Sequence, residues 1–249
     1  MKKIILTLMF VTVTAKAEWI RVLDNLPIVN ALTASGNYVF AGTNVTFQGG
    51  GVYRTTNTGY SWEQVHFSTT LSLSANANFI YRGYQNGFSY SSNYGSNWVT
   101  PGGASRWILS LLSDGNFVYQ GCFTISPTTN TGVWISTNNG FNFTQSSLND
   151  INVYCLTKSG NYLFAGGYTF GIGGGVFVST NNGANWTNPL TSGGDGLASS
   201  GNFIYTGTSS SGIYKSTNYG QNWTQTSLNN ISVNTIEVYG SNVFVGGGF

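Results

Sequence analysis

Charged side chains are scarce in this chain. Only 6% of its 249 residues are Asp, Glu, Lys or Arg, whereas about a quarter is usual for a globular protein. Binding to nucleic acid or to an anionic membrane surface requires a cluster of Lys and Arg, and nine basic residues spread over the chain do not form one. We therefore expect no nucleic-acid partner, and neutral rather than ionic partners in general.

Histidine and cysteine are scarcer still. The single histidine is His66, and the two cysteines are Cys122 and Cys155. No Cys-x-x-Cys pair and no Cys/His cluster occurs, so we predict no metal site and no cofactor. A bridge between the two cysteines requires Cα atoms within about 7 Å. The sequence does not fix that separation, so a disulfide and two free thiols are both compatible with it.

A hydrophobic run long enough to span a bilayer is also missing. The apolar stretch 4–13 is too short, follows Lys2 and Lys3, and precedes Ala15-Lys16-Ala17, a small-x-small cleavage pattern. We expect residues 1–17 to be a secretory signal peptide and residues 18–249 to form an exported domain, which is extracellular, periplasmic or on the cell surface. Cleavage leaves six basic residues against seven acidic ones.

Small, polar and aromatic residues take the place of charge. The chain has 34 glycines and 15% aromatic residues, and the phrase Ser/Thr-x-Asn-x-Gly-x-x-Trp/Phe occurs five times. Its copies lie at 55–62, 91–98, 136–143, 179–186 and 216–223. Successive copies are 36 to 45 residues apart, and a strand-rich period near forty residues is typical of a propeller blade.

Each octapeptide has the residues of a tight turn. Asn at its third position can accept hydrogen bonds from backbone amides two residues on, and Gly at its fifth takes a positive φ without steric cost. The final aromatic residue anchors the next strand by burying a large apolar area. The residues to which we assign these structural roles are Asn57, Gly59, Trp62, Asn93, Gly95, Trp98, Asn138, Gly140, Phe143, Asn181, Gly183, Trp186, Asn218, Gly220 and Trp223.

Four short extended segments, a to d, make up each repeat. In the fourth repeat they are 152–157, 161–166, 175–180 and 185–187, rich in β-branched or aromatic residues and bounded by Gly or Asn. The b segment is apolar on both faces, as expected for a strand buried between neighbouring blades. We predict an all-β fold with almost no helix. Its architecture is a β-propeller, with six blades of mainly four-stranded antiparallel sheets.

The two ends of the chain indicate how the last blade is completed. Residues 18–22 resemble a d segment, and residues 233–237 and 242–246 resemble a and b segments. Strands from the N- and C-terminal ends would then close the last blade, in which no c segment is evident. Either this blade is incomplete or the sequence is truncated after Phe249.

The octapeptide resembles the Asp-box, Ser/Thr-x-Asp-x-Gly-x-x-Trp, of BNR repeats. These repeats occur in sialidases, related glycosidases, sortilin-type receptors and photosystem II assembly factors, and the chain is most similar to secreted bacterial proteins built from such repeats alone. Every copy carries Asn in place of Asp, which keeps the acceptor oxygen but not the charge, and one copy ends in Phe143. The resemblance implies a BNR/Asp-box β-propeller of the sialidase-like and sortilin-like superfamily.

The variable b–c loops are the candidate binding region. In this topology the c–d turns lie on one face and the b–c loops and d–a connections on the other, and function often resides in variable loops on a rigid scaffold. We expect aromatic side chains of these loops to offer flat apolar faces to a sugar ring or a peptide. They are Phe47, Tyr84, Phe123, Tyr168 and Phe170. Covering the ends of the core is an equally compatible role for them.

The resemblance to sialidases also implies an arginine triad, a tyrosine–glutamate pair and an aspartic acid. Among the four arginines, Arg106, just ahead of an a segment, is the one placed to reach a central channel. Glycoside hydrolysis needs two carboxyls facing each other across roughly 5–9.5 Å. The acids near or in a segments are Asp150, Asp195 and Glu237. No nucleophile-elbow phrase accompanies His66.

These observations give one main hypothesis and one alternative. We assign no catalytic residue, and predict an exported, non-catalytic β-propeller that is monomeric and binds protein or neutral carbohydrate, or serves as a structural module. The alternative is a glycoside hydrolase of the sialidase-like superfamily, for which a pair among the three acids would have to converge.

Overall fold

The structure is a computed structural model that describes residues 28–44, 49–102, 106–124, 131–169 and 173–247. All regular structure among these residues is β-strand. In this part of the chain no helix is long and apolar enough to cross a membrane. The chain divides into two compact units, Met1–Thr100 and Pro101–Phe249, and each is considered by itself. The expected signal peptide 1–17 and the expected strand 18–22 lie outside the described residues.

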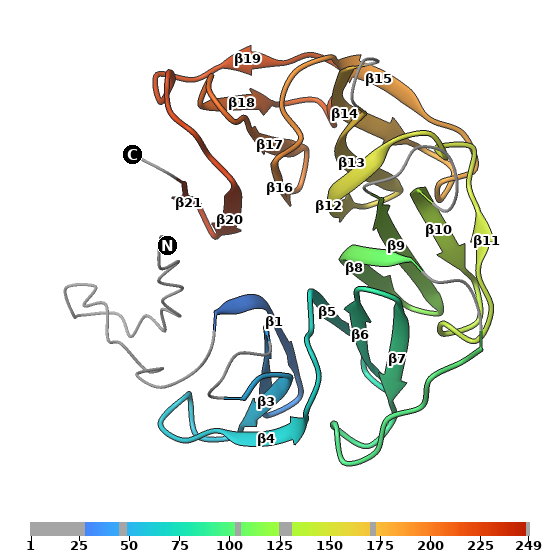
Figure 1. Cartoon of the computed structure of the whole chain (residues 1–249). Coiled ribbons are helices and arrows are strands. Elements are labelled where there is room, and N and C mark those ends of the chain that lie inside the picture. Colours follow the sequence, from blue (N-terminus) through green and yellow to red (C-terminus); the bar gives the residue numbers. More distant parts are fainter. Residues whose placement is uncertain (1–27, 45–48, 103–105, 125–130, 170–172, 248–249) are drawn as a thin grey trace. The chain divides into compact units, whose positions relative to one another are not determined.

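Unit 1 contains two antiparallel sheets (Figure 1). The first sheet consists of β1 (Val29–Ser35), β2 (Tyr38–Thr43), β3 (Val52–Thr55) and β4 (Glu63–His66). The second consists of β5 (Ser72–Ala75), β6 (Ile80–Tyr84) and β7 (Gly87–Ser91). A single bridge between Tyr90 and Val99 stands where a fourth strand would pair, because Pro101 follows closely and has no amide to extend the ladder.

Unit 2 contains four antiparallel sheets, of which three are four-stranded. The first consists of β8 (Trp107–Asp114), β9 (Phe117–Phe123), β10 (Gly132–Ser136) and β11 (Thr144–Gln145). The second consists of β12 (Asn152–Ser159), β13 (Tyr162–Thr169), β14 (Gly173–Ser179) and β15 (Thr187–Leu190). The third consists of β16 (Gly196–Ser200), β17 (Phe203–Gly207), β18 (Ile213–Ser216) and β19 (Thr224–Gln225). The last is the pair β20 (Thr235–Tyr239) and β21 (Asn242–Gly246).

Each sheet follows the predicted order of segments, and neighbouring strands in sequence pair with one another. Tight turns between first and second strands begin with a glycine of positive φ, for example Gly160 (φ 55°) and Gly201 (φ 57°), a conformation that costs glycine little. Because the strands alternate in direction, the first-to-second and third-to-fourth connections leave from one end of a sheet. We call this the octapeptide end, and the opposite one the loop end.

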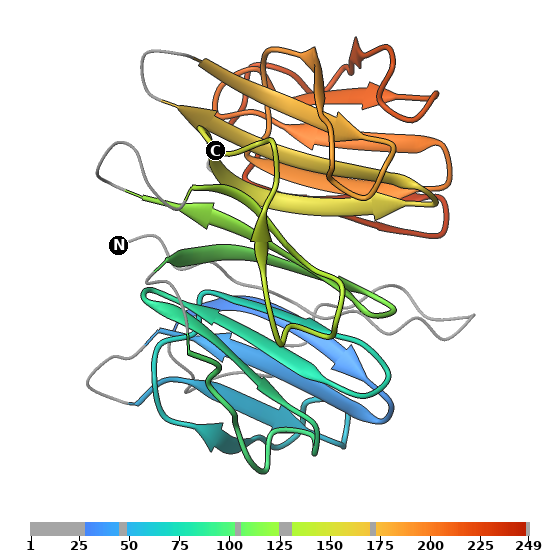
Figure 2. The same ribbon diagram turned by 90° about the vertical axis from the view of Figure 1, so that its right-hand side faces the viewer.

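The core lies between successive sheets of each unit. The second strand is buried on both faces, as Phe40 and Ala41 in β2 and Leu163 and Phe164 in β13 illustrate, all at 0% exposure. In Figure 2 the sheets of unit 2 follow one another face to face, and β12 packs against β8 and β9 on one side and β16 on the other. Burial of each large apolar side chain stabilises this stack by about 1.5–3 kcal/mol, so a second strand without both neighbours would lose most of its packing.

Candidate functional site

The octapeptide turns have the same hydrogen bonds in all five copies. The Ser or Thr hydroxyl at the first position donates to the Asn Oδ1 at the third and accepts from the Gly amide at the fifth, as in Ser179, Asn181 and Gly183 at 2.9 and 2.9 Å. Asn Oδ1 accepts from the amide of the seventh residue, Asn185, at 2.9 Å. The expectation that Asn would accept from two residues on is therefore wrong. The Gly amide two residues on from Asn donates instead to the Ser or Thr hydroxyl, because this shorter side chain lies closer to the start of the turn.

A second feature of these turns was not expected from the sequence. The fourth residue has a positive φ in every copy, between 54° and 57°, and the following glycine has φ between 78° and 94°. Asn139 and Asn182 tolerate this region well, whereas Thr58, Tyr94 and Tyr219 do so at a cost. Two consecutive residues of positive φ reverse the chain tightly, and the hydrogen bonds of the turn hold it there.

The turns also attach each sheet to the one before it within the same unit. Tyr94 stacks on Tyr38 at a centroid distance of 4.7 Å, and Tyr219 stacks on Tyr162 at 4.6 Å. A Cβ on Gly220 would lie 2.8 Å from Cε1 of Phe164 in the preceding sheet. Glycine is thus required at this turn position both because a Cβ would clash and because φ is positive. The octapeptide turns have a structural role.

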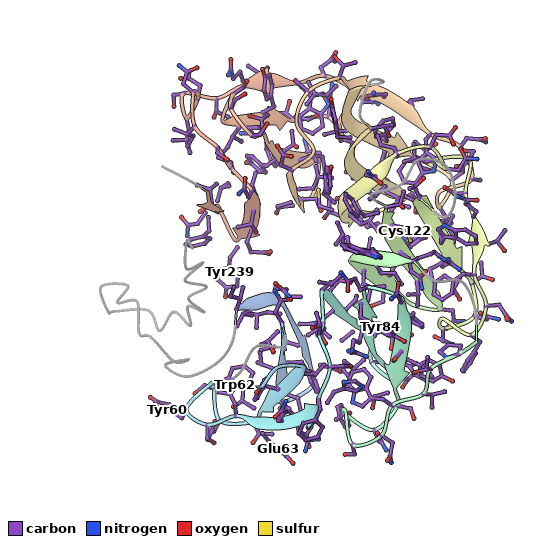
Figure 3. All side chains as sticks on the ribbon, viewed as in Figure 1. Tyr60, Trp62, Glu63, Tyr84, Cys122 and Tyr239 are labelled. Carbon is purple, nitrogen blue, oxygen red and sulfur yellow. The ribbon has the colours of Figure 1, made fainter. Side chains whose placement is uncertain are left out.

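The final aromatic residue of the octapeptide packs inward. Trp186 and Trp223 contact the cores on either side of β13, and each donates its indole N–H to the carbonyl of the turn glycine, at 2.9 and 3.0 Å. Trp62 does the same at 3.0 Å, in the hairpin between β3 and β4 (Figure 3). Trp98 differs, because its indole donates to the carbonyl of Val65 at 3.2 Å and so ties the two sheets of unit 1 together.

A cleft of about 500 Å³ opens at the loop end of the β12–β15 sheet. Its walls are the β13–β14 hairpin, the connection 147–151 from β11 to β12, and residues at the end of β15. Among the described residues, the lining combines apolar surface with uncharged polar groups, with Asp150 as the one ionisable side chain and Phe177 as the one aromatic ring. Such a lining suits an uncharged ligand that has both apolar surface and hydrogen-bonding groups.

Glycine allows the backbone to form this cleft. A Cβ on Gly174 would lie 2.2 Å from the carbonyl oxygen of Gly167, and one on Gly175 would lie 1.9 Å from that of Leu190. Gly173 and Gly175 also have positive φ, 96° and 140°. The hairpin backbone therefore lies against its neighbours more closely than any other residue would permit.

The structure brings two of the predicted loop aromatics to the loop end of neighbouring sheets in unit 2. Phe123 ends β9 and is half-buried, with its ring 6.2 Å from that of Tyr154. Tyr168 lies near the end of β13, is 45% exposed and directly precedes Thr169 of the cleft. Phe47 and Phe170 lie outside the described residues.

Tyr84, in unit 1, has a structural contact. Its ring covers the guanidinium of Arg82 at 4.3 Å, and Figure 3 shows it beside β6 and β7. Arg82 is buried and donates to the hydroxyls of Ser68 and Thr70, at 2.6 and 2.8 Å. Tyr84 thus caps an arginine that fastens the connection from β4 to β5.

Two residues of the loop end, Trp107 and Tyr154, were not predicted as site residues, and Asp195 was considered only as an acid for hydrolysis. Trp107 begins β8 and lies 5.7 Å from the ring of Phe123. Tyr154 and Asp195 occupy equivalent positions of adjacent sheets, because the residue after each one pairs with a corresponding glycine, Gly166 or Gly207. Alignment of the a segments by register would have detected this pair.

Burial raises two pKa values in this group, and neighbouring charges raise one of them further. The pKa of Tyr154 is raised by burial and further by the charges of Asp195 and Tyr168. The pKa of Asp195 is also raised by burial, and a hydrogen bond from the Ser209 backbone opposes this shift. Both other groups raise the pKa of the Tyr154 phenol, so Tyr154, Tyr168 and Asp195 interact electrostatically.

The arginines of the described residues are all engaged within their own unit. Arg54 pairs with Glu63 at 2.6 Å, and Arg82 fastens a connection as described. Arg106, expected to be the one placed to reach a central channel, is instead buried, with its guanidinium 3.6 Å from the Trp134 ring centroid. Arg21 lies outside the described residues. The described part of the chain therefore contains no cluster of free arginines that could bind a ligand carboxylate.

Of the three acids considered for hydrolysis, Asp150 lines the cleft, Asp195 lies beside Tyr154, and Glu237 is on β20. The cysteines are both free thiols. Burial raises the pKa of Cys122 to about 12 and raises that of Cys155 as well, so neither is a reactive thiolate. Over the described residues no group of three or more metal-ligating side chains occurs.

Comparison with known proteins gives likeness in structure alone. No protein-family profile matches the chain, and no curated protein matches it in sequence. An ancestral GH74 enzyme aligns with TM-score 0.67 at 20% identity, over 85% of this chain and 33% of that one. A GH74 xyloglucanase from Xanthomonas campestris aligns with TM-score 0.64 at 12% identity, over 83% and 40%.

A smaller protein is also similar. YCF48 bound to D1 peptide aligns with TM-score 0.61 at 14% identity, over 88% of this chain and 76% of that one. The chain therefore spans a third of the ancestral GH74 enzyme but most of YCF48. At these identities the likeness is one of fold, and it agrees with the six successive antiparallel sheets: the chain is an all-β protein with the β-propeller fold.

Proposed function

We propose that this chain is an exported, non-catalytic β-propeller of the BNR/Asp-box type that binds a neutral protein or carbohydrate ligand at the loop end of unit 2. The observation that carries the proposal is the cleft of about 500 Å³ beside the exposed Tyr168. Its volume is in the range of small-ligand sites, and its lining over the described residues has one ionisable group, Asp150. The octapeptide end, in contrast, is occupied by structural contacts.

The similar structures are compatible with either ligand class. One is a xyloglucanase and another is bound to a peptide, so a propeller of this kind can serve a neutral polysaccharide or a protein segment. A glycoside hydrolase of the sialidase-like superfamily is the second candidate, favoured by Asp150 and Asp195 at the same loop end and by the GH74 neighbours. The engaged arginines disfavour a sialidase-type carboxylate site.

The proposal is tested by screening the full chain, immobilised, against neutral glycans and uncharged peptides. We expect a ligand whose affinity is nearly the same at 0.15 and 1 M salt, because few charges are available to be screened. Tyr168→Ala should weaken it by about 3- to 10-fold, the loss of one aromatic contact. The matched control is Tyr60→Ala, since Tyr60 is 83% exposed at an octapeptide turn.

Four results would contradict the proposal in different parts. Binding that depends on Tyr60 rather than on Tyr168 would move the site to the octapeptide end. Release of reducing sugar from a bound glycan would favour the hydrolase. Retention of residues 1–17 in the protein recovered from its native cells would contradict the proposed export. Elution from a sizing column as a dimer would contradict the predicted monomeric state.

A further inference from the structure

Three aromatic side chains form a row at the loop end of unit 2. Trp107, Phe123 and Tyr154 come from β8, β9 and β12, and successive ring centroids are 5.7 and 6.2 Å apart. Their planes are tilted by 40° and 39°. Each of the three side chains is half-buried, so each ring keeps part of its surface open.

The row differs from other aromatic pairs of unit 2. Phe117 and Tyr119 stack with planes 5° apart, and Tyr162 and Tyr219 with planes 11° apart. A tilt near 40° covers less of each ring face than parallel stacking does, and all three residues remain partly exposed. An open aromatic face binds C–H groups well, because its π-system carries partial negative charge.

Hydrogen-bonding groups lie beside the row. Asp195 is at the register position equivalent to Tyr154 in the next sheet, and its charge acts on the Tyr154 phenol. Its own backbone amide donates to the carbonyl of Gly207 at 3.2 Å, which fixes the start of β16. The backbone that carries the Asp195 carboxylate is therefore held by the β16–β17 pair before a ligand binds.

An extended peptide is a poorer fit to the same place. Peptides that add to a sheet pair with a regular free edge, and β8 and β12 are the edge strands here. Both have a register shift near this end, between Ile108 and Ser110 and between Val153 and Cys155. A shift of this kind interrupts the edge ladder and re-aims a side chain, and the Leu156 amide of β12 already donates to Ser110 Oγ at 3.0 Å.

We infer that Trp107, Phe123 and Tyr154, together with Asp195, form a subsite for one sugar residue of a neutral saccharide. The C–H face of a pyranose packs on the tilted rings, and two of its hydroxyls donate to the Asp195 carboxylate. The inference rests on the proposed binding function and names its ligand class. Asp195 here is a binding residue that holds the sugar and takes no part in bond cleavage.

The experiment uses isothermal titration of the full chain with cellotetraose, mannotetraose and xylotetraose, and with an uncharged peptide of similar length. We expect at least one tetrasaccharide to bind. Asp195→Asn should weaken it by about 10-fold or more, because it removes a charged acceptor, and Phe123→Leu by about 3- to 10-fold. Tyr60→Ala, at an octapeptide turn, should change affinity less than about 2-fold.

A structural effect is separated from a binding effect by a second variant and a second measurement. Tyr154→Phe keeps the ring and removes only the phenol oxygen, so it should retain the unfolding temperature and lose about 3- to 10-fold in affinity. Unfolding temperatures of all variants are compared with the wild type. A variant that loses affinity only because it unfolds would shift this temperature, which the proposed role does not require.

The outcomes separate the inference from the function on which it rests. Tetrasaccharide binding that ignores Phe123, Tyr154 and Asp195, or binding of the peptide alone with dependence on Tyr168, overturns the saccharide subsite and leaves the proposed function standing. Absence of any binding to the wild-type chain overturns both. Cleavage of a tetrasaccharide during titration leaves the subsite in place and overturns the non-catalytic assignment.

Discussion

The two ends of the sheets differ in what their side chains do. At the octapeptide end, the same hydrogen bonds recur in five turns, and the turns contact preceding sheets. At the loop end of unit 2, the connections differ in length and composition, and residues of these connections and of the adjoining strands line a cleft and form the row of aromatic rings. Repetition therefore marks the part that holds the fold together, and irregularity marks the part available for a ligand.

The largest expected effect is at the octapeptide end. Gly220→Ala places a Cβ 2.8 Å from Phe164, at a φ of 78°, and should destabilise the protein by about 2–4 kcal/mol through strain and overpacking. Gly201→Ala is the matched control in the same sheet, because Gly201 has φ 57° with nothing within 4 Å of an added Cβ. It should cost about 1 kcal/mol. Urea unfolding measures both, and equal losses would show that sheet contact contributes nothing.

A smaller loss is expected from the turn hydroxyl. Ser179→Ala removes the donor to Asn181 and the acceptor for the amides of Asn181 and Gly183. It should cost about 1–3 kcal/mol, because the Gly183 amide is buried and would lose its partner. Thr180→Ala is the control, since it removes a hydroxyl at the exposed neighbouring position and should be nearly neutral. Thermal unfolding distinguishes the two, and equal shifts would contradict the role of the Ser179 hydroxyl.

At the loop end of unit 1, stability should depend on pH through His66. Burial, and then the charge of Arg82, lowers the pKa of His66 to about 4. Between its ordinary pKa near 6.5 and about 4, the unfolded chain takes up a proton that the folded chain does not. Stability should therefore fall by roughly 1–2 kcal/mol as pH drops through this window, after allowance for solvent screening. Urea unfolding of His66→Gln at pH 7 and 4.5 should give a flatter profile, and an unchanged profile would contradict the assignment.

The smallest effect on stability, with the opposite sign, is expected at Asp195. Burial raises its pKa in the folded protein, so the folded state favours the protonated carboxyl, and this contribution is lost as pH rises through the folded pKa. Asp195→Asn should then unfold at a slightly higher temperature at pH 7, and this gain should shrink as pH falls through the raised folded pKa and vanish below the ordinary Asp pKa. Higher stability of Asp195→Asn combined with weaker saccharide binding would indicate that Asp195 serves ligand binding and not stability. Lower stability of Asp195→Asn would indicate a structural role instead.

The contrast between the two ends also explains what could be predicted. Turn residues such as Asn181 and Gly183 act on amides within a few positions of themselves, so a single octapeptide contains nearly all the information about its own turn. Tyr154 and Asp195 are 41 positions apart, and their proximity depends on the register of two strand pairs and on a bulge in one of them. Arg106 was misjudged for the same reason, because its partner Trp134 comes from another strand.

The sequence by itself determined the period, the order of strands, the positions of the turns and the all-β propeller fold, because each of these follows from contacts among neighbouring residues and from alternating burial. Only the tertiary structure decided which aromatic rings keep open faces, which arginines are buried, and where a cleft remains. Those properties arise where separate sheets meet, and a side chain there is free or occupied according to neighbours that lie tens of residues away.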